Sequence, residues 1–162
     1  MSSDVREMIS KWAYKHFRDF DTVPPDNEIL KYAKALLICA NGDGTLTPEE
    51  RNWVLGYFAI KGVSDSILSE LKNYQPTESL QEVLDTNSTV AQKGTRFLIY
   101  DAIQTCAADG EYAEGEKAVI RKAASQLKVS EDVVKELEEL YLEEKELFKR
   151  KIDLMFPNGK PH

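Results

Sequence analysis

Two short acidic stretches contain the residues of this sequence whose types and spacing suggest chemistry. Residues 39–50 read CANGDGTLTPEE, and residues 106–116 read CAADGEYAEGE. In both, Cys-Ala precedes Asp-Gly, and a glutamate follows the aspartate by seven residues. Carboxylate oxygens are the ligands that Ca²⁺, Mg²⁺ and Mn²⁺ prefer. The pattern therefore predicts a divalent-cation site with four ligands: Asp43, Glu50, Asp109 and Glu116.

A single offset relates the two stretches. Asp109 lies 66 residues after Asp43, Glu116 lies 66 after Glu50, and Val129 lies 66 after Val63. Three agreements at one period favour an internal duplication, with related segments at about 27–75 and 90–142. If the two halves pack about a pseudo-twofold axis, the four carboxylates converge. Their mutual repulsion would then be relieved by a bound cation.

Helix capping is the competing interpretation of the glutamates. An acid in the first turn of a helix is favoured by the helix dipole alone, and Glu50 also completes a capping box with Thr47. Ala113 stands where Thr47 stands in the first stretch, and it has no hydroxyl group. The capping box therefore does not account for Glu116, which favours the cation site. An EF-hand pair is not expected, because loop position one is Cys39 or Thr105 instead of a carboxylate.

The hydrophobic pattern predicts an all-α fold, with a single domain over residues 1–162. Apolar residues recur at helical spacing, and no segment alternates as a half-buried strand does. We expect seven to eight helices. The expected segments begin near residues 3, 27, 47, 64, 90, 113 and 130, and the last helix reaches about 156. A further short helix, after a break at residues 76–77, is expected to contain Leu80, Val83 and Leu84. Residues 86–89, TNST, are expected to form the loop that joins the two halves.

Several residues are assigned to apolar faces. In the first helix, residues 5, 8, 9, 12, 13, 16, 17 and 20 share one stripe, of the kind that faces a core, and His16 is interpreted as a packing residue. Ile60 and Phe97 are also expected to be buried. In the last helix, Leu140, Leu147 and Leu154 are seven residues apart, which favours packing on the core, with pairing to a second subunit as the alternative.

Composition excludes several classes of function. The 28 acidic and 21 basic residues give a net charge of −7, which opposes nucleic acid as a partner. No apolar run is long enough to cross a membrane, and no secretory segment is recognisable near Met1, so a cytoplasmic location is expected. Cys39 and Cys106 are then expected to be reduced, buried thiols. No nucleophile or phosphate-loop motif is visible, so an enzyme is not expected.

The doubled motif resembles the TerB family of tellurite-resistance-associated proteins. The resemblance rests on an apolar helix that ends in Ala and Asp-Gly, followed by a glutamate, twice within an all-helical domain. It implies seven or eight helices in two related halves, and divalent metal bound at Asp43, Glu50, Asp109 and Glu116. It also implies a protein partner in a bacterial stress-response complex at the membrane. Counted from Cys-Ala, the first stretch has one residue more before its aspartate than the second.

The preferred hypothesis is therefore a cytoplasmic, non-enzymatic module that binds a divalent cation, Ca²⁺, Mg²⁺ or Mn²⁺, in a stress or tellurite-resistance response. A second hypothesis is a metal-independent scaffold, which binds a protein partner through its acidic surface or last helix, or pairs as a homodimer. The third is a thiol-based oxyanion or redox protein that uses Cys39 and Cys106.

Overall fold

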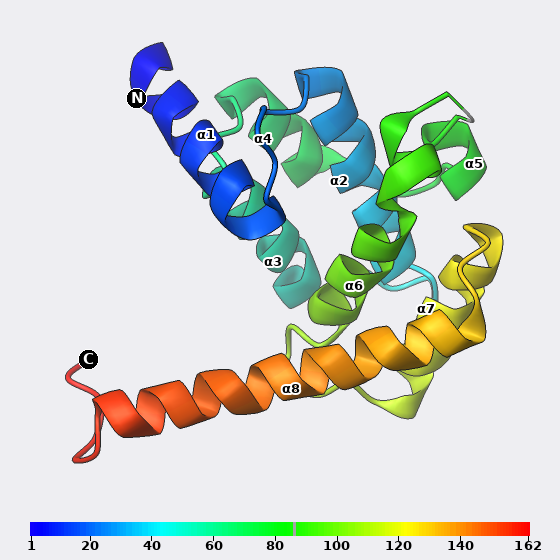
Figure 1. Cartoon of the computed structure of the whole chain (residues 1–162). Helices are drawn as coiled ribbons and strands as arrows, with labels where there is room; N and C mark the ends of the chain where they lie inside the picture. The colour runs from blue at the N-terminus through cyan, green and yellow to red at the C-terminus, as the bar shows by residue number, and fades with distance from the viewer. Residues whose placement is uncertain (86) are drawn as a thin grey trace.

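The computed structural model describes residues 1–85 and 87–162, and every regular element within them is helical. This confirms the predicted all-α class and the predicted number of helices. A π-helical segment, η1, precedes α6 (Figure 1). The elements are α1 (Ser3–Arg18), α2 (Asp26–Ala40), α3 (Pro48–Ala59), α4 (Asp65–Asn73), α5 (Leu80–Val83), η1 (Val90–Gly94), α6 (Thr95–Cys106), α7 (Glu114–Gln126) and α8 (Glu131–Met155).

Side-chain hydroxyl groups begin five of these helices. Each accepts a hydrogen bond from a backbone N–H group in the first turn, a group that has no partner within the helix. At α3 the cap is reciprocal, because Glu50 also accepts from the backbone of Thr47. The helix starts predicted near residues 3, 47, 64 and 130 are therefore confirmed, and Ser79 begins the short helix that was expected to contain residues 80–84. The capping residues are Ser2, Thr47, Ser64, Ser79 and Ser130.

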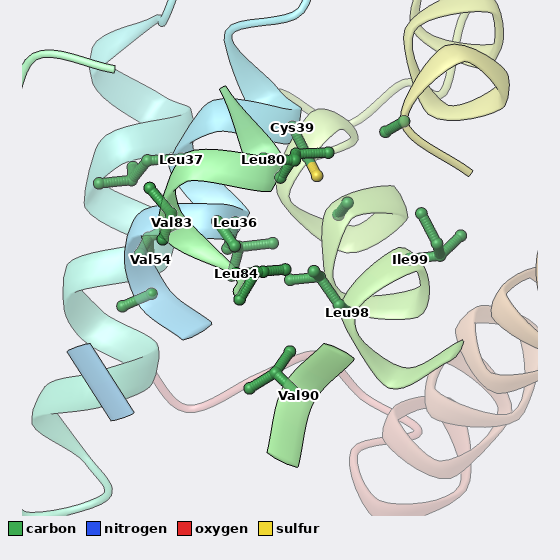
Figure 2. Packing of buried hydrophobic residues seen from close by; sticks show 14 of the residues in the cluster. Leu36, Leu37, Cys39, Val54, Leu80, Val83, Leu84, Val90, Leu98 and Ile99 are labelled. Atoms are coloured by element: carbon green, nitrogen blue, oxygen red, sulfur yellow. The ribbon is translucent and has the colours of Figure 1, made fainter. Parts of the chain in front are cut away.

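The core lies between α2 and α6, and the other helices pack around this pair. Leu36 and Leu37 on α2 and Leu98 and Ile103 on α6 are fully buried. Figure 2 shows Leu36, Leu84 and Leu98 gathered between α2, α5 and α6. Each such side chain contributes roughly 1.5–3 kcal/mol by leaving water. This pair of helices fixes the positions of the two acidic turns, because each turn follows directly from the end of one of them.

The apolar stripe predicted for α1 faces the core only in part. Ala13, a member of the stripe, is buried, but Met8 is 63% and Trp12 is 59% exposed. Tyr14, which was not assigned to the stripe, is buried. The interpretation of His16 as a core packing residue is also wrong, because His16 is exposed and stacks on Trp12 with ring centroids 4.5 Å apart. Periodicity locates an apolar face but does not show what covers it. The side of α1 that packs inward is set by polar contacts instead.

Two further side chains are more exposed than predicted. Ile60 is 56% exposed because it follows Ala59, the last residue of α3, and points away from the core. Phe97 is 39% exposed, and one face of its ring carries the guanidinium group of Arg18, 3.5 Å from the ring centroid. Phe97 therefore contributes to a polar cluster and not to the apolar core.

The helix predicted over residues 90–107 is divided. Its first turn is the π-helical η1, and regular α6 begins at Thr95. In the predicted loop at 86–89, residue 86 lies outside the described residues. The neighbouring turn is held by Asp85, whose side chain accepts a hydrogen bond from the backbone N–H of Asn87.

The last helix, α8, packs against α6 and α7 with its first half only. Val134 is buried, whereas Leu147 is 61% and Phe148 is 63% exposed. Figure 1 shows its second half extending away from the other helices toward the C-terminus. Among the described residues, no helix combines the length and apolar character that a membrane span requires.

Candidate acidic site

The first acidic turn joins α2 to α3. Gly44 has φ +86°, which a residue with a side chain rarely adopts, and its N–H donates to the Asn41 carbonyl at 2.8 Å. Asp43 then accepts a hydrogen bond from the backbone N–H of Thr45 at 2.9 Å through Oδ1. This local bond holds one oxygen of an exposed carboxylate.

The second turn, between α6 and α7, has the same hydrogen bonds. Gly110, at φ +106°, donates to the Ala107 carbonyl at 2.9 Å, and Asp109 accepts from the Glu111 N–H at 3.2 Å. Each of these groups lies 66 residues after its counterpart in the first turn. The additional residue inferred by counting from Cys-Ala is therefore not an insertion: the cysteines are displaced, and Cys39 corresponds to Thr105.

Both glutamates act as helix caps. Glu50 accepts from the Thr47 N–H at 2.9 Å, and Glu116 accepts from the Ala113 N–H at 2.5 Å, each through Oε2. The expectation that Glu116 has no capping role was wrong. Its half of the capping box needs only a backbone N–H, which every residue except proline supplies. Only the reciprocal half, from a hydroxyl group, is absent at Ala113.

The two turns are close enough for their charges to interact. Burial raises the pKa of Glu50, which is only 9% exposed, and the charges of Asp43 and Glu116 raise it further. Burial likewise raises the pKa of Glu116, and Asp109 and Asp43 add to that rise. Asp43 therefore acts on a carboxylate of the other turn. The charges of the four predicted residues therefore act on one another across the two turns, and the surface that carries them is called the acidic face.

Gly42 allows this approach of the two turns. A Cβ atom built on Gly42 would lie 2.6 Å from Cγ1 of Val119, a residue of α7. A side chain at this position would therefore move the first turn away from the helix that follows the second turn.

The four carboxylates do not form a closed ligand shell. Among the described residues, no three His, Cys, Asp or Glu side chains lie close enough together to hold a metal ion. Each glutamate already gives one oxygen to a backbone N–H, and each aspartate does the same. The arrangement therefore fits an ion that keeps most of its own water and contacts one or two carboxylates, as Mg²⁺ does.

The cysteines have the properties of core residues. Cys39 and Cys106 are both free and buried, at 2% exposure. Burial raises the pKa of Cys39 to about 12 and raises that of Cys106 as well. Because the thiolate is the reactive form, both side chains are unreactive at neutral pH. These observations weigh against the thiol-based hypothesis.

A buried polar cluster was not anticipated from the sequence. Asp101, fully buried on α6, accepts hydrogen bonds from Arg18 of α1, Tyr32 of α2 and Tyr57 of α3. Lys61, just after α3, is 1% exposed and lies over the ring of Tyr57. No sequence motif marks these residues, because an arginine or lysine near a helix end is ordinarily solvated.

The comparisons with known proteins agree with this architecture. A family model described as tellurite resistance protein TerB matches residues 29–139, which include both acidic turns. The chain belongs to the TerB family. A solved structure of a tellurite resistance protein from Nostoc punctiforme is 37% identical to it, with a TM-score of 0.93, and the match covers 99% of this chain and 100% of that chain. No curated protein matches.

The boundaries of the TerB match separate two parts of the chain. The core helices and the turns at Asp43 and Asp109 lie inside residues 29–139, whereas α1 and the exposed half of α8 lie outside them. The solved structure from Nostoc punctiforme covers nearly the whole chain, so that protein shares these outer helices as well.

Proposed function

We propose that this TerB protein is a non-enzymatic module that binds a hydrated divalent cation at its acidic face. One observation carries the proposal: the first turn packs directly on α7, where a Cβ atom at Gly42 would lie 2.6 Å from Cγ1 of Val119, so carboxylates of the two turns come within reach of each other's charge. Like charges held together by the fold repel, and a divalent cation relieves that repulsion. The second oxygens, Oδ2 of the aspartates and Oε1 of the glutamates, would face the ion and its water.

Mg²⁺ or Mn²⁺ suits this face better than Ca²⁺. Mg²⁺ commonly keeps several waters and binds through one or two carboxylates, whereas Ca²⁺ takes six to eight oxygen ligands. The two capping bonds restrict Glu50 and Glu116 to one free oxygen each. The resulting site would be weak, and selective for charge more than for ion size.

Thermal unfolding of EDTA-treated protein tests this proposal. A cation at about 100 times its Kd should stabilise the protein by roughly 2.7 kcal/mol, a shift of a few degrees for this chain length. The variant Asp43→Asn with Asp109→Asn should lose most of that shift. Asparagine keeps the side-chain oxygen that accepts from Thr45 and Glu111, so both turns should remain folded.

The matched control is Asp132→Asn with Glu136→Gln in the first turns of α8, two exposed residues that follow the end of α7 opposite the second acidic turn. It removes the same number of charges away from both turns, so it should keep the full response to Mg²⁺ or Mn²⁺. Equal responses in the two double variants would show general screening of net charge instead of a site. The absence of a shift with any divalent cation would also overturn the proposal.

A cellular role in tellurite resistance follows from the relatives. The family model and the protein from Nostoc punctiforme are both described as tellurite resistance proteins. Two free thiols suit the reducing cytoplasm, where a stress-response module would act with protein partners. In a tellurite-sensitive bacterium, the intact protein should improve growth on tellurite, and Asp43→Asn with Asp109→Asn should abolish the improvement. If that variant protected the cells fully, tellurite resistance would not depend on the acidic face.

The exposed half of α8 supports a second candidate function, protein docking. We propose that it binds a second copy of this chain. Four large apolar side chains there are 61–68% exposed: Leu147, Phe148, Leu154 and Met155. The helix is acidic at 143, 144 and 146 and basic at 149–151. Two antiparallel copies would therefore place the basic segment of one beside the acidic segment of the other.

Sedimentation equilibrium of the full chain tests this second function. We expect a dimer that is converted to monomer by Leu147→Glu with Phe148→Glu, two changes on the docking face. The control Glu139→Lys alters charge on the part of α8 that lies over the body and should leave the dimer intact. A chain that is still monomeric at roughly 100 μM, which is about 100 times a dimer Kd of 1 μM, would exclude self-association. The surface would then have to bind another protein.

A further inference from the structure

A cavity of about 600 Å³ lies at the opposite end of α2 from the acidic turns. It is enclosed by the end of α1, the connector at 19–25, the start of α2 and η1. Its volume falls within the range of about 300–1,000 Å³ that is typical of small-molecule sites. Most of its lining is apolar, including Val23, Ile29, Phe58, Val90 and Phe97.

Lys61 lines this cavity and is unusual in its surroundings. Its side chain is almost completely buried, and in the part of the chain that the structure describes its ammonium group has no hydrogen-bond acceptor and no ion pair. It lies 3.6 Å from the ring centroid of Tyr57 and 4.8 Å from that of Phe58. Aromatic faces attract a cation but do not replace the hydrogen bonds that it loses on leaving water.

The neighbouring carboxylate does not satisfy Lys61. Asp101 accepts hydrogen bonds from Arg18, Tyr32, Tyr57 and Gln104. Its lone pairs are therefore used by those four donors. Arg18, the other buried cation at the cavity, is neutralised by this carboxylate, whereas Lys61 is not.

Two of the three acidic residues at the edge of the cavity are paired with other groups. Asp19 and Asp21 form ion pairs with Lys15 at 2.8 and 3.0 Å. Glu28 lies 3.9 Å from Lys31 through Oε1, and its buried Oε2 has no hydrogen-bond partner among the described residues. Among the described residues, Lys93 at the rim has no such ion pair, and it is exposed. The unpaired positive charge of Lys61 therefore lies within a largely apolar lining that also holds one unpaired carboxylate oxygen, Oε2 of Glu28.

We propose that this cavity binds a small organic acid, whose carboxylate accepts hydrogen bonds from the Lys61 ammonium group and whose apolar part contacts Ile29, Val90 and Phe97. The ligand class follows from the two properties of the lining. A bare inorganic oxyanion would leave the apolar walls without a partner, and a neutral hydrocarbon would leave Lys61 without an acceptor. This site is independent of the acidic face.

Isothermal titration calorimetry with octanoate, in metal-free buffer, tests the proposal on the full chain. Octanoate should bind saturably with one molecule per chain. Octanamide, which has the same chain without the charge, should bind about tenfold more weakly or worse, because a hydrogen bond to a charged group is lost. Inorganic phosphate should not bind. Equal affinity for octanoate and octanamide, or binding of phosphate alone, would overturn the assignment without any variant.

Lys61→Met provides the second test, with Lys93→Met as the matched control. Methionine keeps the length of the lysine side chain without its charge, so the cavity should retain its shape. Lys61→Met should lower octanoate affinity about tenfold or more, whereas Lys93→Met at the exposed rim should change it much less. If Lys61→Met bound octanoate as tightly as the wild type, Lys61 would not be the group that donates to the carboxylate.

Proton uptake gives a readout that a purely structural role of Lys61 would not produce. Burial lowers the pKa of Lys61 to about 7, a shift to which Arg18 adds and which Asp101 opposes. The other titratable groups that face Lys61 are Tyr14 and Tyr57, whose pKa values burial raises. At pH 8, octanoate should therefore bind with uptake of nearly one proton, measured in buffers of different ionisation enthalpy. Lys61→Met should show no uptake, and uptake in that variant would refute the assignment.

Discussion

Arg18 at the end of α1 and Asp101 in the middle of α6 form a buried ion pair across 83 residues of sequence. Their side chains are only 6% and 0% exposed. The carboxylate also accepts from Tyr32 and Tyr57, so one group on α6 connects α1, α2 and α3. This cluster holds the end of α1, and hydrogen bonds from Arg6 to the Val63 carbonyl and from Ser10 to the Lys61 carbonyl hold the rest of the helix.

Asp101→Asn should destabilise the protein by about 3 kcal/mol or more. The amide has a single acceptor oxygen, so it cannot accept from both Tyr32 and Tyr57, which donate to different oxygens of the carboxylate. The Arg18 charge would also be buried without a counter-ion, which is the costly outcome for a buried pair. Urea denaturation followed by circular dichroism measures the change. Asp65→Asn is the control, because it breaks the Arg6–Asp65 pair, whose carboxylate is 90% exposed, and it should have a small effect. Similar losses in the two variants would mean that burial does not control the strength of these pairs.

Helix positions and caps could be predicted because their determinants are local. Thr47 and Glu50 are three residues apart, so a capping box is visible in the sequence itself. The same holds for Asp43 and Asp109, each followed by a glycine that adopts positive φ. The acidic turns were therefore placed correctly, whereas the convergence of their four carboxylates on one cation stays a prediction.

The buried polar cluster and the orientation of α1 could not be predicted in this way. Arg18, Lys61 and Asp101 are far apart in sequence, and each alone is typical of a solvated surface. Trp12 and Met8 form an apolar stripe that the fold leaves exposed. Periodicity gives the direction of a face within one helix, and the partner of that face depends on contacts between distant segments.

Lys61→Met should stabilise the protein most at neutral pH and below. The folded pKa of Lys61 is about 7, and the unfolded value is near 10.5. Below pH 7 lysine is charged in both states, so the wild type bears the full cost of burying the ammonium group. Between pH 7 and about 10 the unfolded chain binds more protons, so wild-type stability rises with pH.

Denaturation of the wild type and Lys61→Met at several pH values measures this difference. The advantage of the variant should decrease above pH 7, with a slope that approaches about 1.4 kcal/mol per pH unit. The tyrosines near Lys61 titrate in both proteins and cancel in the comparison. Lys93→Met should show no such dependence. A constant difference between wild type and Lys61→Met from pH 6 to pH 10 would show that Lys61 stays charged in the folded protein.

Gly62→Ala should destabilise the protein by about 2 kcal/mol or more. Gly62 has φ +77°, and a Cβ atom there would lie 2.8 Å from the Arg6 carbonyl and 2.6 Å from Oγ of Ser10, both on α1. The substitution adds backbone strain of roughly 1–2 kcal/mol and pushes α1 away from the end of α3. Thermal unfolding measures the loss.

Gly56→Ala is the matched control for Gly62→Ala. Gly56 lies within α3, and a Cβ atom there would meet nothing within 4 Å. Alanine is favoured over glycine inside a helix by up to about 1 kcal/mol, so this variant should be more stable than the wild type. Opposite signs for the two variants are the expected result. A stabilising Gly62→Ala would mean that α1 is not held close to this glycine.

Ala113→Ser should stabilise the protein by about 0.5–1 kcal/mol, because it would complete the second capping box. Ala113 already has the extended backbone of an N-cap residue, at φ −79° and ψ 167°, and Glu116 already accepts from its N–H. A serine hydroxyl would accept from the free N–H of Glu116, as Thr47 does for Glu50 at 3.1 Å. Thr47→Ala is the converse change and should lose about 1 kcal/mol. If Ala113→Ser gave no gain while Thr47→Ala gave that loss, the two turns would differ in the way they begin their helices, despite their shared hydrogen bonds.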